Sequence, residues 1–252
     1  MLYPPARIGN RSRYTAAWLI IGFLLFQVSF TAQKISMLFE FTTEDTWTTM
    51  WRAVSGRWVS TDDPTAPSPP RVITQLADYL DFPKIYLDQG EMYDYEAEVA
   101  LKIRPFQDEH QPVPGFSVFE IRPEELPEVA HPRDYAGGLL LRYRGPFAFV
   151  AAIADARTRR LYVLRMTVQG LKVLKKADIP IELNTWYRLR AICYLDQIVL
   201  YWNGQPVVRT RERRLTGGRI GLLTIGTSRV YFDDFRVRTE RIRMVTPDTS
   251  AP

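Results

Sequence analysis

The feature that most constrains the fold is a succession of short segments in which apolar and polar residues alternate. In "YDYEAEVALKI", residues 93–103, the odd-numbered positions are apolar or aromatic, and the even-numbered positions are mostly charged. Successive side chains of a β-strand point to opposite faces, so this pattern predicts a strand buried on one side.

Eight further segments downstream also have the character of strands. They are "GGLLLRYRG", "FAFVAAIAD", "RLYVLRMTV", "LKVLKKADI", "TWYRLRAICYL", "QIVLYWNGQPVV", "GRIGLLTI" and "RVYFDDFRV". Turn residues separate almost all of them, and Asn203-Gly204 is typical of a type I′ hairpin turn, in which both central residues need positive φ. Short strands without intervening helical periods predict an all-β antiparallel sandwich or barrel. With 252 residues, 46% of them hydrophobic, the chain can bury one full-sized core.

Two regions interrupt the predicted strands, and a third forms a C-terminal tail. Residues 61–71, "TDDPTAPSPPR", read as a proline-rich loop, and residues 104–135 read as a long insertion with room for one short helix. We therefore predict a β-sandwich over residues 34–240, with the insertion at about 104–135, and a flexible tail over residues 241–252.

The N-terminus predicts a membrane anchor. Arg7, Arg11 and Arg13 precede an uncharged apolar run, residues 16–32, which is typical of a secretory signal or of a single transmembrane helix. Cleavage after Ala32 would put Phe30 at a position that favours small residues, so we favour a retained signal-anchor within residues 1–33. This predicts a single-pass protein of the cell inner membrane, with its N-terminus in the cytoplasm and its C-terminal domain periplasmic or extracellular.

Charge and cysteine content exclude several classes of function. The net charge is +5, and three of the arginines precede the apolar run, which leaves no basic footprint for nucleic acid. Residues 209–214 and 236–243 are locally basic; we interpret them as solvated strand ends, with an anionic partner or lipid headgroups as the alternative. Cys193 is the only cysteine, and its apolar neighbours predict a core residue rather than a nucleophile.

Several of these segments together resemble a known family. The run "NTWYRLRA", "DQIVLYWNGQPV", "GGRIGLLT" and "VYFDDFRV" is similar to the closing half of concanavalin-A-like (laminin-G-like) jelly-roll domains, especially those named for 3-keto-disaccharide hydrolases. "VSGRWVS" and "AGGLLLRY" resemble the opening and central elements of those domains. The resemblance covers residues 45–240 and implies a jelly-roll β-sandwich. It is less specific for function, because this fold carries lectins, hydrolases and adhesive modules.

The acidic row Asp94, Glu96 and Glu98 is the candidate catalytic site. All three side chains should lie on one face of the strand, and paired carboxylates are the catalytic groups of glycoside hydrolases. The resemblance implies an order E-x-D-x-E in sandwich glucanases, whereas this chain has D-x-E-x-E and no interleaved tryptophans. We therefore favour a solvated face, with Lys102 nearby.

Aromatic residues provide the candidate ligand-binding or partner-binding site. The residues are Trp186, Tyr194, Tyr201 and Trp202, which surround the predicted hairpin and have the ring character that stacks on sugars or fills a partner's pocket. Residues 198–202 are apolar on both faces, which predicts a central strand covered on both sides.

Asp233 and Asp234 are the candidate metal ligands. Because they are adjacent in a strand, they should point to opposite faces. No D-x-D-x-D loop accompanies them, so we predict no cofactor, with a structural calcium ion as the less favoured alternative. The two histidines, His110 and His131, both lie in the predicted insertion and do not favour a zinc site.

Three functional hypotheses follow. The first is a membrane-anchored, non-catalytic accessory subunit that docks on protein partners in a larger respiratory or photosynthetic complex. The second is a carbohydrate-binding module of the lectin type. The third, which the family resemblance implies, is a glycosidase or keto-sugar hydrolase that uses Asp94, Glu96 and Glu98.

Overall fold

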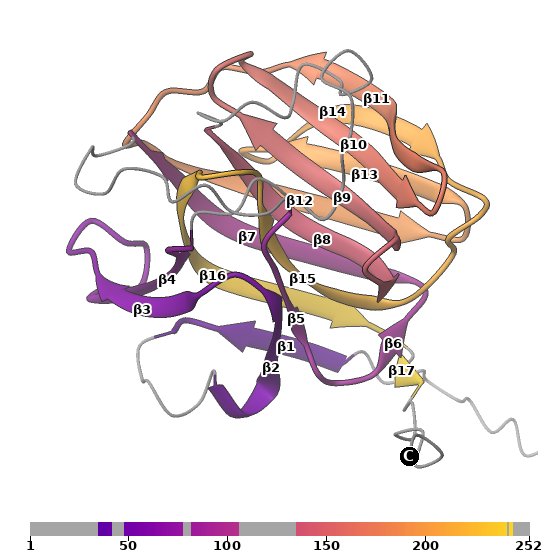
Figure 1. The fold of residues 1–252 in the computed structure, drawn as a ribbon, viewed down its shortest axis with the longest axis horizontal. Helices are drawn as coiled ribbons and strands as arrows, with labels where there is room; N and C mark the ends of the chain where they lie inside the picture. Colours follow the sequence, from indigo (N-terminus) through magenta and orange to yellow (C-terminus); the bar gives the residue numbers. More distant parts are fainter. Residues whose placement is uncertain (1–34, 42–47, 78–81, 106–134, 241, 244–252) are drawn as a thin grey trace, which may run out of the picture. The chain divides into compact units, whose positions relative to one another are not determined.

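The computed structural model describes residues 35–41, 48–77, 82–105, 135–240 and 242–243. This part of the chain forms two antiparallel β-sheets packed face to face (Figure 1), which confirms the predicted all-β sandwich. The predicted anchor at residues 16–32, most of the insertion and most of the tail lie outside the described residues. Within the described ranges, no helix is long and apolar enough to span a membrane.

The first sheet, called sheet A here, contains eight of the described strands. In spatial order they are β14 (Gln205–Arg211), β13 (Gln197–Trp202), β12 (Trp186–Tyr194), β7 (Tyr95–Arg104), β16 (Arg229–Thr239), β4 (Arg71–Gln75) and β3 (Trp58–Asp62), with β1 (Ile35–Phe39) also paired to β16. The order brings β7 between β12 and β16, although about 80 and 120 positions separate these strands from β7 in the sequence.

The second sheet, sheet B, contains seven of the described strands. They are β11 (Gly170–Asp178), β10 (Arg160–Thr167), β9 (Ala148–Asp155), β8 (Ala136–Gly145), β15 (Arg219–Thr224), β5 (Lys84–Leu87) and β2 (Trp51–Ser55). A separate small pair consists of β6 (Glu91–Met92) and β17 (Ile242–Arg243).

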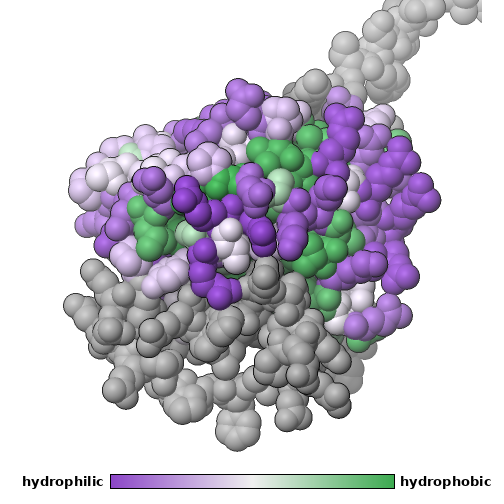
Figure 2. Space-filling view, turned by 90° about the horizontal axis from the view of Figure 1, so that it is seen from above, coloured by the Kyte–Doolittle hydropathy of each residue, from purple (hydrophilic) through white to green (hydrophobic). Residues whose placement is uncertain are grey.

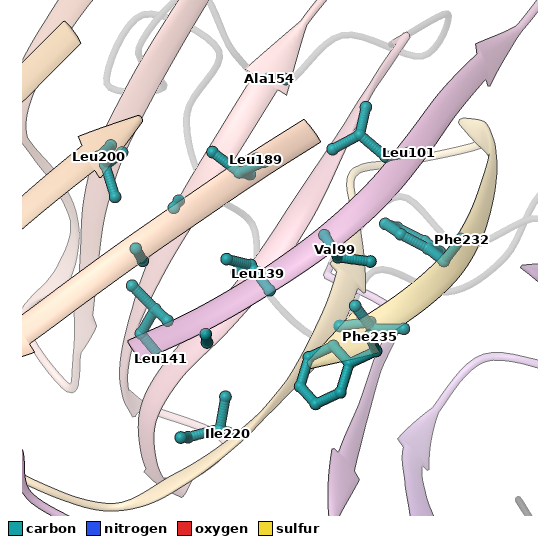
Figure 3. Packing of buried hydrophobic residues seen from close by; sticks show 14 of the residues in the cluster. Val99, Leu101, Leu139, Leu141, Ala154, Leu189, Leu200, Ile220, Phe232 and Phe235 are labelled. Carbon is teal, nitrogen blue, oxygen red and sulfur yellow. The ribbon is translucent and has the colours of Figure 1, made fainter. Parts of the chain in front are cut away.

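The core lies between the two sheets. Figure 3 shows Val99 and Leu101 of β7 with Leu139 and Leu141 of β8, and all four are fully buried. Burying each side chain of this size stabilises the fold by roughly 1.5–3 kcal/mol. Cys193 belongs to the same cluster, and burial raises the pKa of its thiol, which confirms it as a core residue.

The outer faces of the two sheets differ in character. Buried apolar residues of sheet B alternate between two clusters, so that Leu139 faces the core and Leu140 faces outward, into a second apolar cluster with Ile153. On sheet A the residues that alternate with the core residues are mostly charged or aromatic. The outer face of sheet A is therefore the polar surface of the sandwich, and we call it the polar face.

The predicted hairpin at Asn203-Gly204 is confirmed. Trp202 pairs with Gln205 across a two-residue turn, and both central residues have positive φ, 48° and 81°. The Asn203 side-chain oxygen also accepts a hydrogen bond from the backbone N–H of Arg188 at 2.8 Å, which ties the turn to β12.

The prediction that residues 198–202 form a central strand covered on both sides is wrong. Strand β13 is the second strand from the edge of sheet A, and only Ile198, Leu200 and Trp202 point into the core. On the polar face Val199 and Tyr201 are half-buried. The reason is that Tyr201 lies under the guanidinium of a neighbouring arginine, which a sequence pattern of apolar residues does not reveal.

Arg142 is a fully buried arginine in a bulged part of β8, with φ of 51°. Its guanidinium donates to the backbone carbonyls of Leu215 at 2.7 Å, Leu195 at 2.8 Å and Glu212 at 3.1 Å. Burying a charge costs less where hydrogen bonds replace water, so the carbonyls that accept from Nη1 and Nη2 stabilise the buried Arg142. Its Nε is buried without a hydrogen-bond partner in the described part of the chain. The hydrogen bonds from Nη1 and Nη2 connect the turn between β12 and β13 and the loop between β14 and β15 to sheet B.

Candidate functional site

The polar face is built from the outward residues of β13, β12, β7 and β16. In β7, Tyr95, Ala97 and Val99 point into the core, so the alternating Glu96 and Glu98 point outward. The strand pairing places Arg190 beside Glu98, and Tyr201 on the other side of Arg190. Residues from distant parts of the chain thus form one cross-strand row of an aromatic ring, a cation and an anion.

Glu96 and Glu98 are held by arginines from the neighbouring strands. Arg238 donates from Nη1 to Glu96 Oε1 at 3.2 Å, and Arg190 Nη1 lies 3.7 Å from the same oxygen. Arg188 donates from Nη1 to Glu98 Oε1 at 3.3 Å. These pairs are partly exposed, so each adds about 0–1 kcal/mol to stability. Their main effect is to fix the direction of the polar groups.

Asp94, the third member of the acidic row, has a different role. Its Oδ1 accepts a hydrogen bond from the backbone N–H of Leu195 at 2.7 Å, at the turn between β12 and β13. The structure therefore places Asp94 at the end of the polar face as a turn-fixing residue, and Glu96 and Glu98 in an arginine network.

Lys102 sits between two aromatic rings at the other end of the face. Its Nζ lies 5.0 Å from the ring centroid of Trp186 and 5.5 Å from that of Tyr231, within cation–π range. The same nitrogen pairs with the Asp63 carboxylate and donates to Thr65 Oγ1 at 2.9 Å. Burial alone would raise the pKa of Asp63, but hydrogen bonds from Lys102 and Thr65 outweigh burial and lower it.

The proline-rich segment is a loop that docks on the polar face. Thr65 Oγ1 accepts a hydrogen bond from Trp186 Nε1 at 3.2 Å. Further along, the backbone N–H of Ser68 donates to Asp233 Oδ2 at 2.7 Å, and Ser68 Oγ donates to Asp234 Oδ1 at 2.6 Å. Residues 63–70, called the docked loop below, are thus fixed to β12, β7 and β16.

Asp233 and Asp234 lie on the same face, which corrects the expectation of opposite faces. The pairing of β16 with β7 shifts between Asp233 and Arg236, and Asp234 has φ of 47°. A β-bulge inserts one extra residue, so two consecutive side chains can point outward before the alternation resumes at the buried Phe235. Asp234 then reaches Arg188, whose Nη2 donates to its Oδ2 at 2.6 Å.

Burial shifts the titration of Asp233. The residue has no exposed surface, and burial raises the pKa of its carboxyl to about 6. Hydrogen bonds from the backbone N–H groups of Ser68 and Asp234 oppose this shift, and the nearby charges of Asp234 and Glu40 add to it.

The four predicted aromatic residues do not form one cluster. Trp186 and Tyr201 lie on the polar face, and the Arg190 guanidinium stands 4.0 Å from the Tyr201 ring centroid. Trp202 points into the core, where it stacks on a neighbouring tyrosine at 4.8 Å. Tyr194 is 59% exposed and lies at the opposite end of β12 from Trp186.

Sequence reasoning missed Arg188, Arg190 and Tyr231 as members of this site. A signal for the first two was present, because Trp186, Arg188 and Arg190 alternate with core residues and so share one face. No signal indicated that β12 and β16 would flank β7, since that order depends on the topology of the whole sheet.

The donor set of the site does not favour a metal ion. Within the described ranges, His, Cys, Asp and Glu side chains form no group of three or more that could hold one. Asp233 and Asp234 are instead engaged by Ser68 and Arg188. His110 and His131 lie outside the described residues.

The described strands define a class of fold, the two-sheet antiparallel jelly-roll β-sandwich, and solved structures share it. The carbohydrate-binding module CBM66 from Bacillus subtilis shares the fold, with a TM-score of 0.54 and 16% identity over 74% of this chain and 94% of that one. The GH43 protein BlXynB from Bacillus licheniformis has a TM-score of 0.52 and 13% identity over 79% of this chain and 38% of its own. No protein-family model matches the sequence. A search of curated proteins gives no significant match.

Proposed function

We propose that this protein is a carbohydrate-binding module of the lectin type and that the polar face is its binding surface. The observation that carries the proposal is the row in which Tyr201, Arg190 and Glu98 stand side by side on neighbouring strands, with Trp186 further along the same face. A sugar has both apolar C–H groups and hydroxyl groups, and alternating aromatic rings and fixed charged groups can bind both.

A sugar ring has apolar C–H faces and a rim of hydroxyl groups. An aromatic side chain provides a flat apolar surface for a C–H face, and Trp186 and Tyr201 are half-buried on the polar face. Hydroxyl groups need both donors and acceptors, which the guanidinium of Arg190 and the carboxylates of Glu96 and Glu98 provide. Because ion pairs already hold these groups, little side-chain entropy is lost when a ligand binds.

The docked loop supports the same proposal. Thr65 binds the indole nitrogen of Trp186 and the ammonium group of Lys102, so the ring is fixed in place before any ligand arrives. A binding group that is already rigid in the free protein gives tighter and more specific binding than a mobile one.

The comparison with CBM66 supports a binding role through the shared fold, and the likeness to a GH43 protein is compatible with a sugar ligand as well. The carboxylates that would act in hydrolysis are tied to arginines and to a backbone N–H, an arrangement that suits recognition better than acid–base catalysis. A hydrolase of the 3-keto-disaccharide type and an accessory subunit with protein partners both stay predictions. Tethering to a membrane through residues 16–32 is part of the proposal.

A glycan array followed by calorimetric titration tests the proposal. We expect oligosaccharide binding, and we expect Trp186→Ala and Tyr201→Ala each to weaken it about tenfold, or ~1.4 kcal/mol. Phe147→Ala removes an exposed ring at the turn between β8 and β9 of sheet B and should leave the affinity unchanged.

Thermal unfolding of each variant separates loss of binding from loss of folding. If the array and titrations with wild-type protein show no oligosaccharide binding, the proposal is wrong. Release of reducing ends from a bound oligosaccharide would favour the hydrolase instead.

A further inference from the structure

A second charged surface lies along one side of the sandwich. Strands β11 and β14 are the terminal strands of sheet B and sheet A, and they lie next to each other at the top of Figure 1. Figure 2 looks down on this side, where hydrophilic side chains cover much of the surface. The exposed basic residues here, called the basic edge, are Lys172, Lys175 and Lys176 of β11 with Arg209 and Arg211 of β14.

The basic edge carries charge that its surroundings do not neutralise. Within the described part of the chain, none of these five side chains forms an ion pair. The acids nearby already have other partners. Glu212 is buried against Arg165 at 2.9 Å, and Asp196 pairs with Arg213 at 3.3 Å.

Lysines on an exposed edge strand also protect a sheet against pairing with another chain, and that role accounts for β11. It does not account for β14, because the arginines of this strand point to the polar face. Val208 points into the core, so Arg209 on the next position points to the polar face, beside Val199. Val199 pairs with Ile192, which pairs with Glu96. Arg209 therefore belongs to a cross-strand row of the proposed binding surface.

We infer that the ligand of the polar face is an acidic glycan, one whose sugar units carry carboxylate groups, and that Arg209 and Arg211 of the basic edge bind those carboxylates. This inference rests on the proposed function. Arginine fits the inference because its planar guanidinium binds a carboxylate through two parallel hydrogen bonds. Arg209 and Arg211 are two positions apart in a strand, about 6.6–6.8 Å, and so can contact neighbouring units of a chain.

An anionic membrane surface would also attract five basic groups. The glycan is favoured because Arg209 and Arg211 point to the face that holds Trp186 and Tyr201, so one extended ligand can contact the rings and the cations together.

The test compares oligogalacturonate with its fully methyl-esterified form, which has the same backbone without the charge. We expect the free acid to bind at least tenfold tighter at 50 mM salt and to lose most of that advantage at 500 mM salt, because salt shortens the range of charge interactions. Arg209→Gln/Arg211→Gln should weaken binding of the free acid roughly tenfold and leave binding of the ester unchanged.

The matched control is Arg52→Gln/Arg57→Gln, which removes the same charge from exposed positions in β2 and in the link between β2 and β3. It should bind the free acid as tightly as the wild type. Equal affinity for acid and ester would overturn the inference and leave the proposed function standing. If neither the free acid nor the ester binds, or if vesicles that contain anionic phospholipid bind more strongly than the free acid, the inference is overturned too. Titration with neutral oligosaccharides would then test the proposed function separately.

Discussion

Asp233 is a buried carboxyl group in the bulge of β16, and both of its oxygens accept backbone N–H groups. Ser68 donates to one oxygen at 2.7 Å and Asp234 to the other at 2.8 Å. Two such bonds would favour the ionised form. The raised pKa, about 6, indicates that burial and the neighbouring acidic charges outweigh them.

A pH dependence of stability follows from Asp233. An aspartate that is buried with a pKa near 6, against 3.8 for an ordinary one, holds its proton more tightly in the folded protein than in the unfolded chain. Its contribution to stability is therefore greatest below about pH 4 and is lost as the pH rises to about 6. Relative to the wild type, Asp233→Asn should gain about 1–3 kcal/mol of unfolding free energy between pH 4 and pH 7.

Urea unfolding of both proteins at several pH values measures this gain. The informative quantity is how the difference in unfolding free energy between the two proteins changes from pH 4 to pH 7. The difference at a single pH also contains the effect of replacing one acceptor oxygen with the donor group of Asn. An unfolding free-energy difference that stays constant from pH 4 to pH 7 would show that Asp233 does not titrate in this range.

The same residue marks a limit of sequence reasoning. The alternation of apolar and polar residues correctly predicted that Glu96 and Glu98 share a face. It failed at Asp233 and Asp234, because a bulge breaks the two-residue period. The bulge is accompanied by contacts to Ser68, more than 160 positions away in the sequence, and local patterns carry no information about such contacts.

The hairpin of β13 and β14 depends on the backbone conformation of its turn. Gly204 has φ of 81°, which an L-residue adopts with strain, and a Cβ atom added there would meet no other atom within 4 Å. Gly204→Ala should therefore cost about 1 kcal/mol through the backbone alone. For a domain of this size the expected loss is roughly 2–4 °C in melting temperature.

Gly145, at the end of β8, provides the control for this prediction. A Cβ atom there would also meet nothing within 4 Å, but its φ lies outside the positive region. Gly145→Ala should leave the melting temperature unchanged or raise it slightly, because alanine reduces the entropy of the unfolded chain. Equal losses in the two variants would contradict a role for the positive φ of Gly204.

The sequence predicted that the docked loop is a loop, but it did not predict where the loop lies. The prolines of residues 61–71 correctly predicted a loop, but its ends were wrong, because Thr61 and Asp62 belong to β3 and Arg71 begins β4. Its position over Lys102 and Trp186 depends on hydrogen bonds from Thr65 and Ser68, and polar residues of this kind are common in loops that contact nothing.

Strands β1, β4 and β5 were not among the predicted segments. Strands β7 to β16 were predictable, because alternation or turn residues such as Asn203-Gly204 mark them in the local sequence. The grouping of residues on the polar face was not predictable. It exists because β12, β7 and β16 are neighbours in sheet A, which brings Arg188 between Glu98 and Asp234. Strand order depends on which apolar faces pack together across the entire chain. Alternation could therefore place a single residue on one face of its strand, but it could not predict that Arg188, Glu98 and Asp234 would meet.

The predicted anchor would place the sandwich at a membrane, and this prediction can be tested on the full chain. Residues 16–32 lie outside the described residues and contain no charge. An arginine in the middle of a transmembrane helix costs about 2.5–3.5 kcal/mol in insertion. Leu24→Arg should therefore move most of the protein from the carbonate-washed membrane fraction to the supernatant.

Val168→Arg, at a position that is 86% exposed in the turn between β10 and β11, adds the same charge to the sandwich and should leave the protein in the membrane fraction. Sequencing the N-terminus of the membrane-bound protein completes the test, because a retained anchor leaves the basic segment before residue 16 in place. A chain that begins near Gln33 would mean that the segment is a cleaved secretory signal, and the sandwich would then act without a tether of its own.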